Sequence, residues 1–229
     1  MPSESVSSAS DGSRQYFSAR PDIASRPGAV RLHLPDVSLD LATDRGVFAR
    51  NDVDPGTKLL LLHGPDATAT DSELVDLGCG YGPIALVLAH RNPQARIWAV
   101  DVNERARSLC RANAADNGLE NITVVAPDEF PSDLPVERIW SNPPIRIGKA
   151  ALHDLLTRWI DRLAPGGSAH FVVQKHLGSD SLHRWLEQSG WATTRRRSQS
   201  AYRLLDVSAR TAGTSDRHGG PGPLPATSE

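Results

Sequence analysis

The sequence predicts an α/β fold: a mostly parallel, seven-stranded sheet with helices on both faces, its last strand antiparallel, preceded by a small N-terminal β-hairpin. Three observations predict it. Short apolar segments alternate with segments of helical periodicity, a pattern typical of a parallel sheet covered on both sides. Two strand-like segments in succession end this pattern and favour one antiparallel strand added at the sheet edge. Near the start, two segments of alternating polarity flank a turn, which predicts the hairpin.

The strands are predicted from short runs of apolar residues. The hairpin comprises 30–34 and 37–41, where apolar and polar residues alternate on either side of Pro35-Asp36. The sheet strands follow as apolar runs bounded by turn-forming or charged residues. In chain order these runs are 74–77, 96–100, 122–126, 138–141, 169–173, 191–195 and 202–207.

The helices are predicted at 83–90, 104–117, 149–163 and 181–188. Pro83 suits a first helical turn, and Asn103 and Gly118 suit the two ends of the second helix. The third helix has an apolar stripe, which we expect Pro165-Gly166-Gly167 to end. The segment 56–62 is compatible with either a short helix or a strand.

Composition divides the chain of 229 residues into four parts. Residues 1–14 contain six serines, and residues 211–229 contain twelve Gly, Pro, Ser or Thr. Such segments bury too little apolar surface to offset chain entropy, so we expect both to be disordered tails. Between them we expect the hairpin and a lead-in segment at 15–62, and a catalytic domain at 63–210.

Several function classes are excluded by composition. The longest strictly apolar run, 84–89, is far shorter than a membrane span, and no signal-peptide pattern opens the chain. Cys79 and Cys110 form neither a disulfide framework nor a metal cluster, and the histidines lack metal-ligand spacing, so we expect a cytoplasmic protein without metal. A net charge of −2 gives no general attraction to nucleic acid, so any RNA contact needs a local basic patch.

The segment from Leu74 to Gly82, LVDLGCGYG, is the strongest single signal in the sequence. Glycines at alternate positions let the turn be tight and let a ligand lie against bare backbone. The spacing G-x-G-x-G differs from the dinucleotide pattern G-x-G-x-x-G. Asp76, two residues before Gly78, would repel a pyrophosphate but suits an ammonium group. The loop therefore predicts a ligand with a positive end.

Other residues around this loop are candidates for the same ligand. Asp101 ends the next strand and can accept hydrogen bonds from both ribose hydroxyls, or alternatively cap the next helix. Asp128 follows the third strand and can reach an adenine amino group. We also assign Val102, Asn142 and Cys79 to this site, although Cys79 and Tyr81 can equally fill space between the glycines.

The motif Ser141-Asn142-Pro143-Pro144-Ile145 ends the fourth strand. Two consecutive prolines fix the chain rigidly and cannot continue a strand ladder. The Asn142 side chain and the Pro143 carbonyl each offer an acceptor, and two acceptors suit a planar NH2 group. Such a clamp orients the nitrogen toward a methyl donor, although Pro-Pro turns also occur for structural reasons.

DLGCGYG, Asp101 and SNPPI, in this order, resemble Rossmann-like class I S-adenosylmethionine-dependent methyltransferases that modify planar nitrogens. More narrowly, the chain is similar to the bacterial ribosomal RNA guanine-N2 methyltransferases of the "methyltransferase small" domain family, of the small-subunit methyltransferase C type. Residues 42–62 and 163–174 match this family as well, and the similarity covers roughly 15–208.

The resemblance implies S-adenosylmethionine held by Asp76, Gly78, Gly80, Gly82 and Asp101. It also implies that Asn142 and Pro143, with Pro144 and Ile145, form the catalytic site around the amino group of a guanine taken out of its stack. Family members usually carry an aromatic residue where this chain has Ile145. Phe48 or Tyr202 can supply a ring, unless they belong to the core. Better-known relatives also have a second, cofactor-free domain ahead of the catalytic one.

Basic residues near the motif are candidates for an RNA surface. Arg195, Arg196 and Arg197 form the densest basic run and can grip phosphate, or alternatively form a solvated loop. Other candidates near the Asn-Pro-Pro motif or after the fifth strand are Arg146, Lys149, His153, Gln174, Lys175 and His176. RNA docking would then use this patch or a partner copy, so both a monomer and a homodimer stay open.

The sequence leaves other functions open. A methyltransferase acting on adenine N6 or on a protein glutamine amide also uses Asn-Pro-Pro. A dinucleotide-dependent oxidoreductase is disfavoured by Asp76 and by Pro83 at the next expected glycine. A non-catalytic cofactor-binding protein is disfavoured by the presence of Asp76, Asp101 and Asn142 together.

Overall fold

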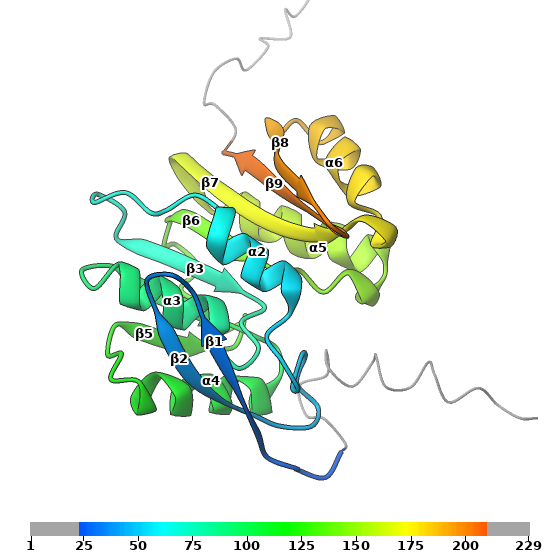
Figure 1. Cartoon of the computed structure of the whole chain (residues 1–229). Coiled ribbons are helices and arrows are strands. Elements are labelled where there is room, and N and C mark those ends of the chain that lie inside the picture. The colour runs from blue at the N-terminus through cyan, green and yellow to red at the C-terminus, as the bar shows by residue number, and fades with distance from the viewer. Residues whose placement is uncertain (1–22, 210–229) are drawn as a thin grey trace, which may run out of the picture.

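The computed structural model describes residues 23–209. The predicted tails 1–14 and 211–229 lie outside these residues. Seven strands form one sheet in the order β5-β4-β3-β6-β7-β9-β8, and β1 and β2 form a separate hairpin (Figure 1). The strands are β1 (Gly28–His33), β2 (Ser38–Thr43), β3 (Glu73–Leu77), β4 (Arg96–Val100), β5 (Ile122–Val125), β6 (Val136–Ser141), β7 (Leu163–Gln174), β8 (Thr193–Gln199) and β9 (Tyr202–Ser208). The predicted seven-stranded sheet and hairpin are confirmed.

The helices cover both faces of the sheet, as predicted. They are α2 (Pro55–His63), α3 (Pro83–Arg91), α4 (Glu104–Asp116), α5 (Lys149–Ile160) and α6 (Ser179–Gln188), with short 3-10 turns at Ile145–Ile147 and Lys175–Leu177. Side chains of α2, α3, α4 and the hairpin share one apolar cluster with one sheet face, and α5 and α6 share a second cluster with the other. The ambiguous segment 56–62 is therefore a helix within the main core.

The last strand is antiparallel, as predicted, but it does not lie at the sheet edge. β9 runs antiparallel to both of its neighbours, β7 and β8. It is inserted between them, so the edge strand is β8 (Figure 1). β8 begins at Thr193 rather than at Trp191, because the Trp191 N–H donates to the Leu186 carbonyl of α6 at 3.2 Å and the ladder with β9 starts only at Thr193.

The predicted end of the third helix is wrong. α5 ends at Ile160, and Pro165-Gly166-Gly167 lies within β7. The register between β6 and β7 shifts between the pairs Val136–Leu163 and Arg138–Ser168, which accommodates these residues as a bulge. Gly166 has φ +81°, a conformation that glycine adopts readily.

No helix within residues 23–209 is both long enough and apolar enough to cross a membrane.

Candidate functional site

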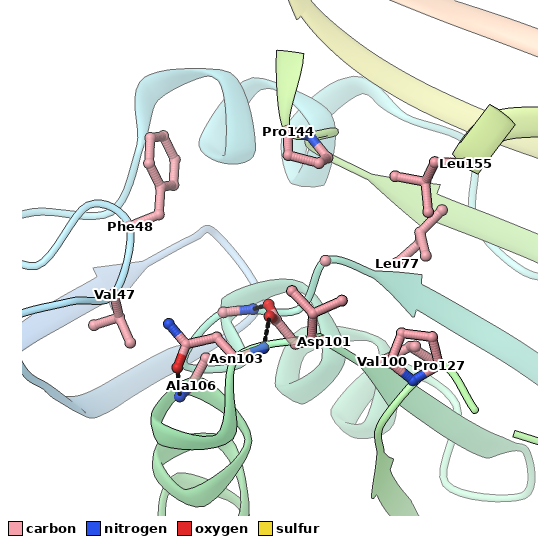
Figure 2. Close-up of a pocket in the computed structure, with 13 residues that line it drawn as sticks. Val47, Phe48, Leu77, Val100, Asp101, Asn103, Ala106, Pro127, Pro144 and Leu155 are labelled. Atoms are coloured by element: carbon pink, nitrogen blue, oxygen red, sulfur yellow. Dashed lines mark hydrogen bonds between the residues drawn. The ribbon is translucent and has the colours of Figure 1, made fainter. Parts of the chain in front are cut away.

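Two adjoining pockets lie at the carboxyl ends of the parallel strands, where open α/β sheets bind ligands. The first, called the glycine-loop pocket, is lined by Val47, Phe48, Leu77, Gly78, Gly80, Val100, Asp101, Val102, Asn103, Ala106, Pro127, Pro144 and Leu155 (Figure 2). The second, called the Asn-Pro-Pro pocket, is lined by Phe48, Ala49, Asp54, Asn142, Pro143, Pro144, Ile145, Arg146, Gln174, Leu177 and Tyr202. Phe48 and Pro144 line both, so the two predicted motifs share one connected site.

The glycine loop presents bare backbone to the first pocket. Gly78 and Gly80 have φ of +77° and +56°, and a Cβ built on either would meet nothing within 4 Å. A side chain there would project into the open space that the pocket offers. The loop is anchored because the N–H groups of Gly78 and Cys79 donate to the Val100 carbonyl at 2.8 and 3.0 Å. This cradle fits a ligand that packs closely on backbone, as S-adenosylmethionine is expected to do.

Asp101 lines the glycine-loop pocket and also ties its walls together. Its carboxylate accepts hydrogen bonds from the N–H groups of Gly80 and Asn103, both at 2.8 Å. Burial raises the pKa of Asp101 above its ordinary value, against the lowering effect of these N–H donors. Asn103 is the N-cap of α4, as predicted, and its Nδ2 donates to the Gly46 carbonyl at 2.8 Å. Asp101 therefore lines the pocket, and the N-cap of α4 is Asn103 rather than Asp101.

Asp76 lies fully buried beneath the glycine loop and does not line the pocket. Its Oδ2 accepts a hydrogen bond from the Ala85 N–H at 2.9 Å, at the start of α3. Its Oδ1 is buried without a hydrogen-bond partner among the described residues. Burial raises the pKa of Asp76 to about 8. Its predicted contact with an ammonium group stays a prediction.

Asn142 lines the Asn-Pro-Pro pocket instead of the glycine-loop pocket, and three other candidates for the cofactor do not line the glycine-loop pocket either. Cys79 is buried, and its Sγ faces the Gly80 carbonyl at 3.5 Å. Gly82 is needed for packing, because a Cβ there would lie 2.8 Å from the Cys110 Sγ. Asp128 is exposed, and its neighbour Pro127 lines the pocket instead. Val102 does line it, with 42% of its surface exposed.

The Asn-Pro-Pro motif is held by contacts on both sides. Ser141 Oγ donates to the Leu77 carbonyl at 2.6 Å, which joins the ends of β6 and β3. Asn142 Nδ2 donates to Asp54 Oδ1 at 2.9 Å and to Thr57 Oγ1 at 3.1 Å. The Pro143 carbonyl accepts the Ile145 N–H at 2.8 Å, which leaves one of its lone pairs for another donor.

Two aromatic rings line the Asn-Pro-Pro pocket, in addition to Ile145. Phe48 is 50% exposed, so it does not belong to the core. Tyr202 is half-buried. Its ring packs closely on Gly56, because a Cβ added to Gly56 would lie 2.6 Å from Tyr202 Cε1. Phe48, Val102 and Leu177 are three of the four exposed large apolar residues in the described chain, and all three line these pockets. Such gathering is typical of a binding site.

Most candidates for the RNA surface lie outside both pockets. Arg146 is exposed and lines the Asn-Pro-Pro pocket, whereas Lys149 is exposed in the first turn of α5. The other basic candidates bond to neighbouring groups: Lys175 to the Ser200 carbonyl, Arg195 to Asp180, Arg196 to Asp206 and Arg197 to Gln199. Of these candidates, the structure thus brings Arg146 and Gln174 to the Asn-Pro-Pro pocket.

Sequence reasoning missed Asp54 and Thr57, which contact Asn142. Asp54 is the N-cap of α2, with Pro55 in the first turn. An acidic residue followed by proline ahead of an apolar run is a helix-start signal, and it could have identified this helix. The contact with Asn142 spans 88 positions and has no local signal.

Comparisons with known proteins agree with this geometry. The model of the Methyltransferase small domain matches residues 38–206. The uncharacterized protein YbxB of Bacillus subtilis is 34% identical over 179 residues, which cover 77% of this chain and 89% of that protein. Ribosomal RNA small subunit methyltransferase C of Shewanella amazonensis is 32% identical over 151 residues, covering 64% of this chain and 43% of that enzyme. The Pseudomonas aeruginosa enzyme of that name is 33% identical, covering 70% and 52%.

Among solved structures, the 16S rRNA N2 G1207 methyltransferase of T. thermophilus, in complex with AdoMet and guanosine, has a TM-score of 0.70. It is 23% identical, and the match covers 83% of this chain and 52% of that one. The two proteins therefore share a fold. The chain spans about half the length of the ribosomal RNA methyltransferases that it matches.

Proposed function

The chain belongs to the Methyltransferase small domain family, and from this we propose that it methylates the exocyclic N2 amino group of a guanine in ribosomal RNA. Its cofactor is S-adenosylmethionine. One observation carries the choice of an amino group as target: Asn142 stands in a pocket that adjoins the cofactor pocket, with both of its own amide hydrogens directed at the protein.

The cofactor pocket has suitable groups for each part of such a ligand. Gly78 and Gly80 offer backbone without side chains, and Asp101 can accept from ribose hydroxyls with its remaining lone pairs. Val102 offers an exposed apolar surface for the adenine ring. Asp76 lies beneath the loop and outside the pocket lining, and its unpartnered Oδ1 would accept a hydrogen bond from an ammonium group there. The bound cofactor supplies an electrophilic methyl group.

The Asn-Pro-Pro pocket supplies orientation rather than acid or base chemistry. Asn142 Oδ1 and the second lone pair of the Pro143 carbonyl accept the two hydrogens of the target amine. Both hydrogens are then fixed, and the nitrogen lone pair is directed toward the methyl donor. After methylation the nitrogen loses its extra proton to water, so no side chain is required as a base.

A nucleobase in ribosomal RNA is favoured as the substrate by two considerations. Phe48 and Tyr202 line the same pocket as Ile145, which stands where the family usually has an aromatic residue. Their rings can stack on a base in place of that residue. The curated relatives at 32% and 33% identity are named ribosomal RNA methyltransferases. The RNA would dock through a local basic patch that includes Arg146.

One experiment tests the target. The protein is incubated with methyl-labelled S-adenosylmethionine and, separately, with small ribosomal subunits, protein-free ribosomal RNA and release factors. We expect label in RNA, recovered as N2-methylguanosine after digestion to nucleosides. Label in N6-methyladenosine or in a glutamine side chain would identify a different target. If calorimetry detects cofactor binding but no substrate gains label, the proposed function is wrong.

A further inference from the structure

We infer that Asp54 is a positioning residue that sets which end of the Asn142 amide, the carbonyl oxygen or the NH2, the substrate meets. This inference rests on the proposed function, because it explains how the acceptor for the target amine is oriented. Asp54 contacts Asn142 directly, and both residues line the Asn-Pro-Pro pocket.

The chemistry of the contact fixes the orientation of the amide. Asp54 Oδ1 lies 2.9 Å from Asn142 Nδ2, and Thr57 Oγ1 lies 3.1 Å from the same nitrogen. An ionised carboxylate accepts hydrogen bonds and donates none, so the amide group that faces it must be the NH2. With its NH2 hydrogens engaged by Asp54 and Thr57, the Asn142 amide has its carbonyl oxygen left to offer a ligand.

Asp54 is itself held in place by the helix that it begins. Its Oδ1 accepts the Thr57 N–H at 3.0 Å as the N-cap of α2, and its backbone carbonyl accepts the Lys58 N–H at 2.9 Å. Tyr202 Oη donates to the other carboxylate oxygen at 3.4 Å. The start of α2 thus brings a fixed acceptor to Asn142, which directly follows β6 and lies 88 positions later in the chain than Asp54.

This arrangement matters because an amide can turn over. A flipped Asn142 would present NH2 to the substrate, and two donors would then face each other. The flip would also place the carbonyl oxygen against the Asp54 carboxylate, where two acceptors repel. Asp54 therefore makes the pocket a site for N–H donors and rejects a substrate atom that can only accept.

The test compares variants that separate helix capping from the contact with Asn142. Asp54→Ser keeps a good N-cap but is too short to reach Asn142, whereas Asp54→Asn keeps an acceptor oxygen for both. Asp52→Ser is the matched control, because Asp52 is an exposed acid in the same segment that pairs with Lys58. Each is measured for kcat and KM on the RNA that accepts label, for cofactor affinity and for melting temperature.

We expect kcat of Asp54→Ser to fall on the order of 100-fold, as misplaced reactive groups do, with cofactor affinity and melting temperature unchanged. We expect Asp54→Asn to have a kcat much closer to that of the parent protein than Asp54→Ser has, and Asp52→Ser to have the kcat of the parent. In an Asn142→Ala background, Asp54→Ser has no further effect, because it acts through Asn142. A further loss in the double variant, or full turnover by Asp54→Ser, would overturn the inference.

A second readout needs no substrate. In the NMR spectrum of the 15N-labelled chain, the Asn142 side-chain NH2 resonances are identified by their absence in Asn142→Ala. We expect slow hydrogen exchange at this NH2, lost in Asp54→Ser and retained in Asp52→Ser. If exchange is the same in all of them, Asp54 does not hold the amide. This result decides the orientation even if no RNA is methylated and the proposed function fails.

Discussion

Phe48 and Pro144 each line both pockets, so these two residues mark where the predicted cofactor and target sites adjoin. Figure 2 shows both of them at the glycine-loop pocket. Phe48 comes from the segment between β2 and α2, and Pro144 from the segment between β6 and the 3-10 turn at Ile145–Ile147. Methyl transfer needs in-line approach over a short distance. A shared boundary made by two side chains from distant parts of the sequence meets that requirement.

Asn142→Ala separates catalysis from cofactor binding. We expect kcat to fall on the order of 100- to 1,000-fold, the range seen when one preorganised polar contact to a reacting group is removed. Calorimetry should give a cofactor affinity close to that of the parent, because Asn142 lines only the Asn-Pro-Pro pocket. Equal losses of turnover and cofactor affinity would instead assign Asn142 to the cofactor.

Phe48→Ala tests base stacking. Stacking of a base on an aromatic side chain contributes about 1–3 kcal/mol, so we expect KM for RNA to rise about tenfold or more. Melting temperature should change little, because Phe48 is 50% exposed. Leu62→Ala is the control: Leu62 is also a large exposed apolar residue but lines neither pocket. The same rise in both variants would argue against stacking by Phe48.

Gly80→Ala tests the cradle for the cofactor. The new Cβ would project into the glycine-loop pocket, so we expect weaker cofactor binding by calorimetry. Forcing alanine into a left-handed conformation also costs about 1 kcal/mol of stability. Gly118→Ala is matched for that strain, with φ +66° and open space, but lies outside the pocket. Only Gly80→Ala should lose affinity, and an equal loss in Gly118→Ala would contradict the prediction.

Asp76 predicts a pH dependence of stability. Its folded pKa is raised to about 8 from an ordinary 3.8, so between these values the folded carboxyl keeps a proton that the unfolded chain releases. Stability is therefore lost as pH rises through this window, by at most about 1.4 kcal/mol per pH unit. Asp76→Asn should remove this slope in urea unfolding curves recorded across the window. An unchanged slope would show that other groups cause it.

Arg146→Gln tests the local RNA contact. If Arg146 neutralises a phosphate, the variant should weaken binding and reduce the slope of log affinity against log salt by about 0.7 to 0.9. Arg158→Gln is the control, because Arg158, which lies on α5, is also exposed but does not line the Asn-Pro-Pro pocket. Identical salt slopes for Arg146→Gln and the parent protein would exclude the phosphate contact.

The motifs could be predicted because their signals are local. Three alternate glycines after an apolar strand, and Asn142 before two prolines, need no distant partner to be interpreted. The bulge at Pro165-Gly166-Gly167 could not be predicted, since these residues usually end elements and only the ladder with β6 keeps them in a strand. The sequence identifies Phe48 as a candidate ring but cannot predict its exposure, because a sequence does not tell an exposed ring from a buried one.

Side-chain contacts between distant parts of the chain could not be predicted for a related reason. Arg196 pairs with Asp206 on the neighbouring strand, a partner that depends on the bulge between Arg195 and Arg197. Asp54 reaches Asn142 only because α2 begins beside the end of β6. Pairings of this kind follow from tertiary packing rather than from spacing in the sequence.

The position of Tyr202 on β9, the last strand in chain order, has a consequence for the order in which the protein matures during synthesis. Tyr202, at the start of β9, supplies one wall of the Asn-Pro-Pro pocket and a donor to Asp54. A growing chain that has released β7 from the ribosome but not β9 lacks both. The Asn-Pro-Pro pocket is thus complete only after the last strand of the sheet has emerged, when the chain is already long enough to close its core.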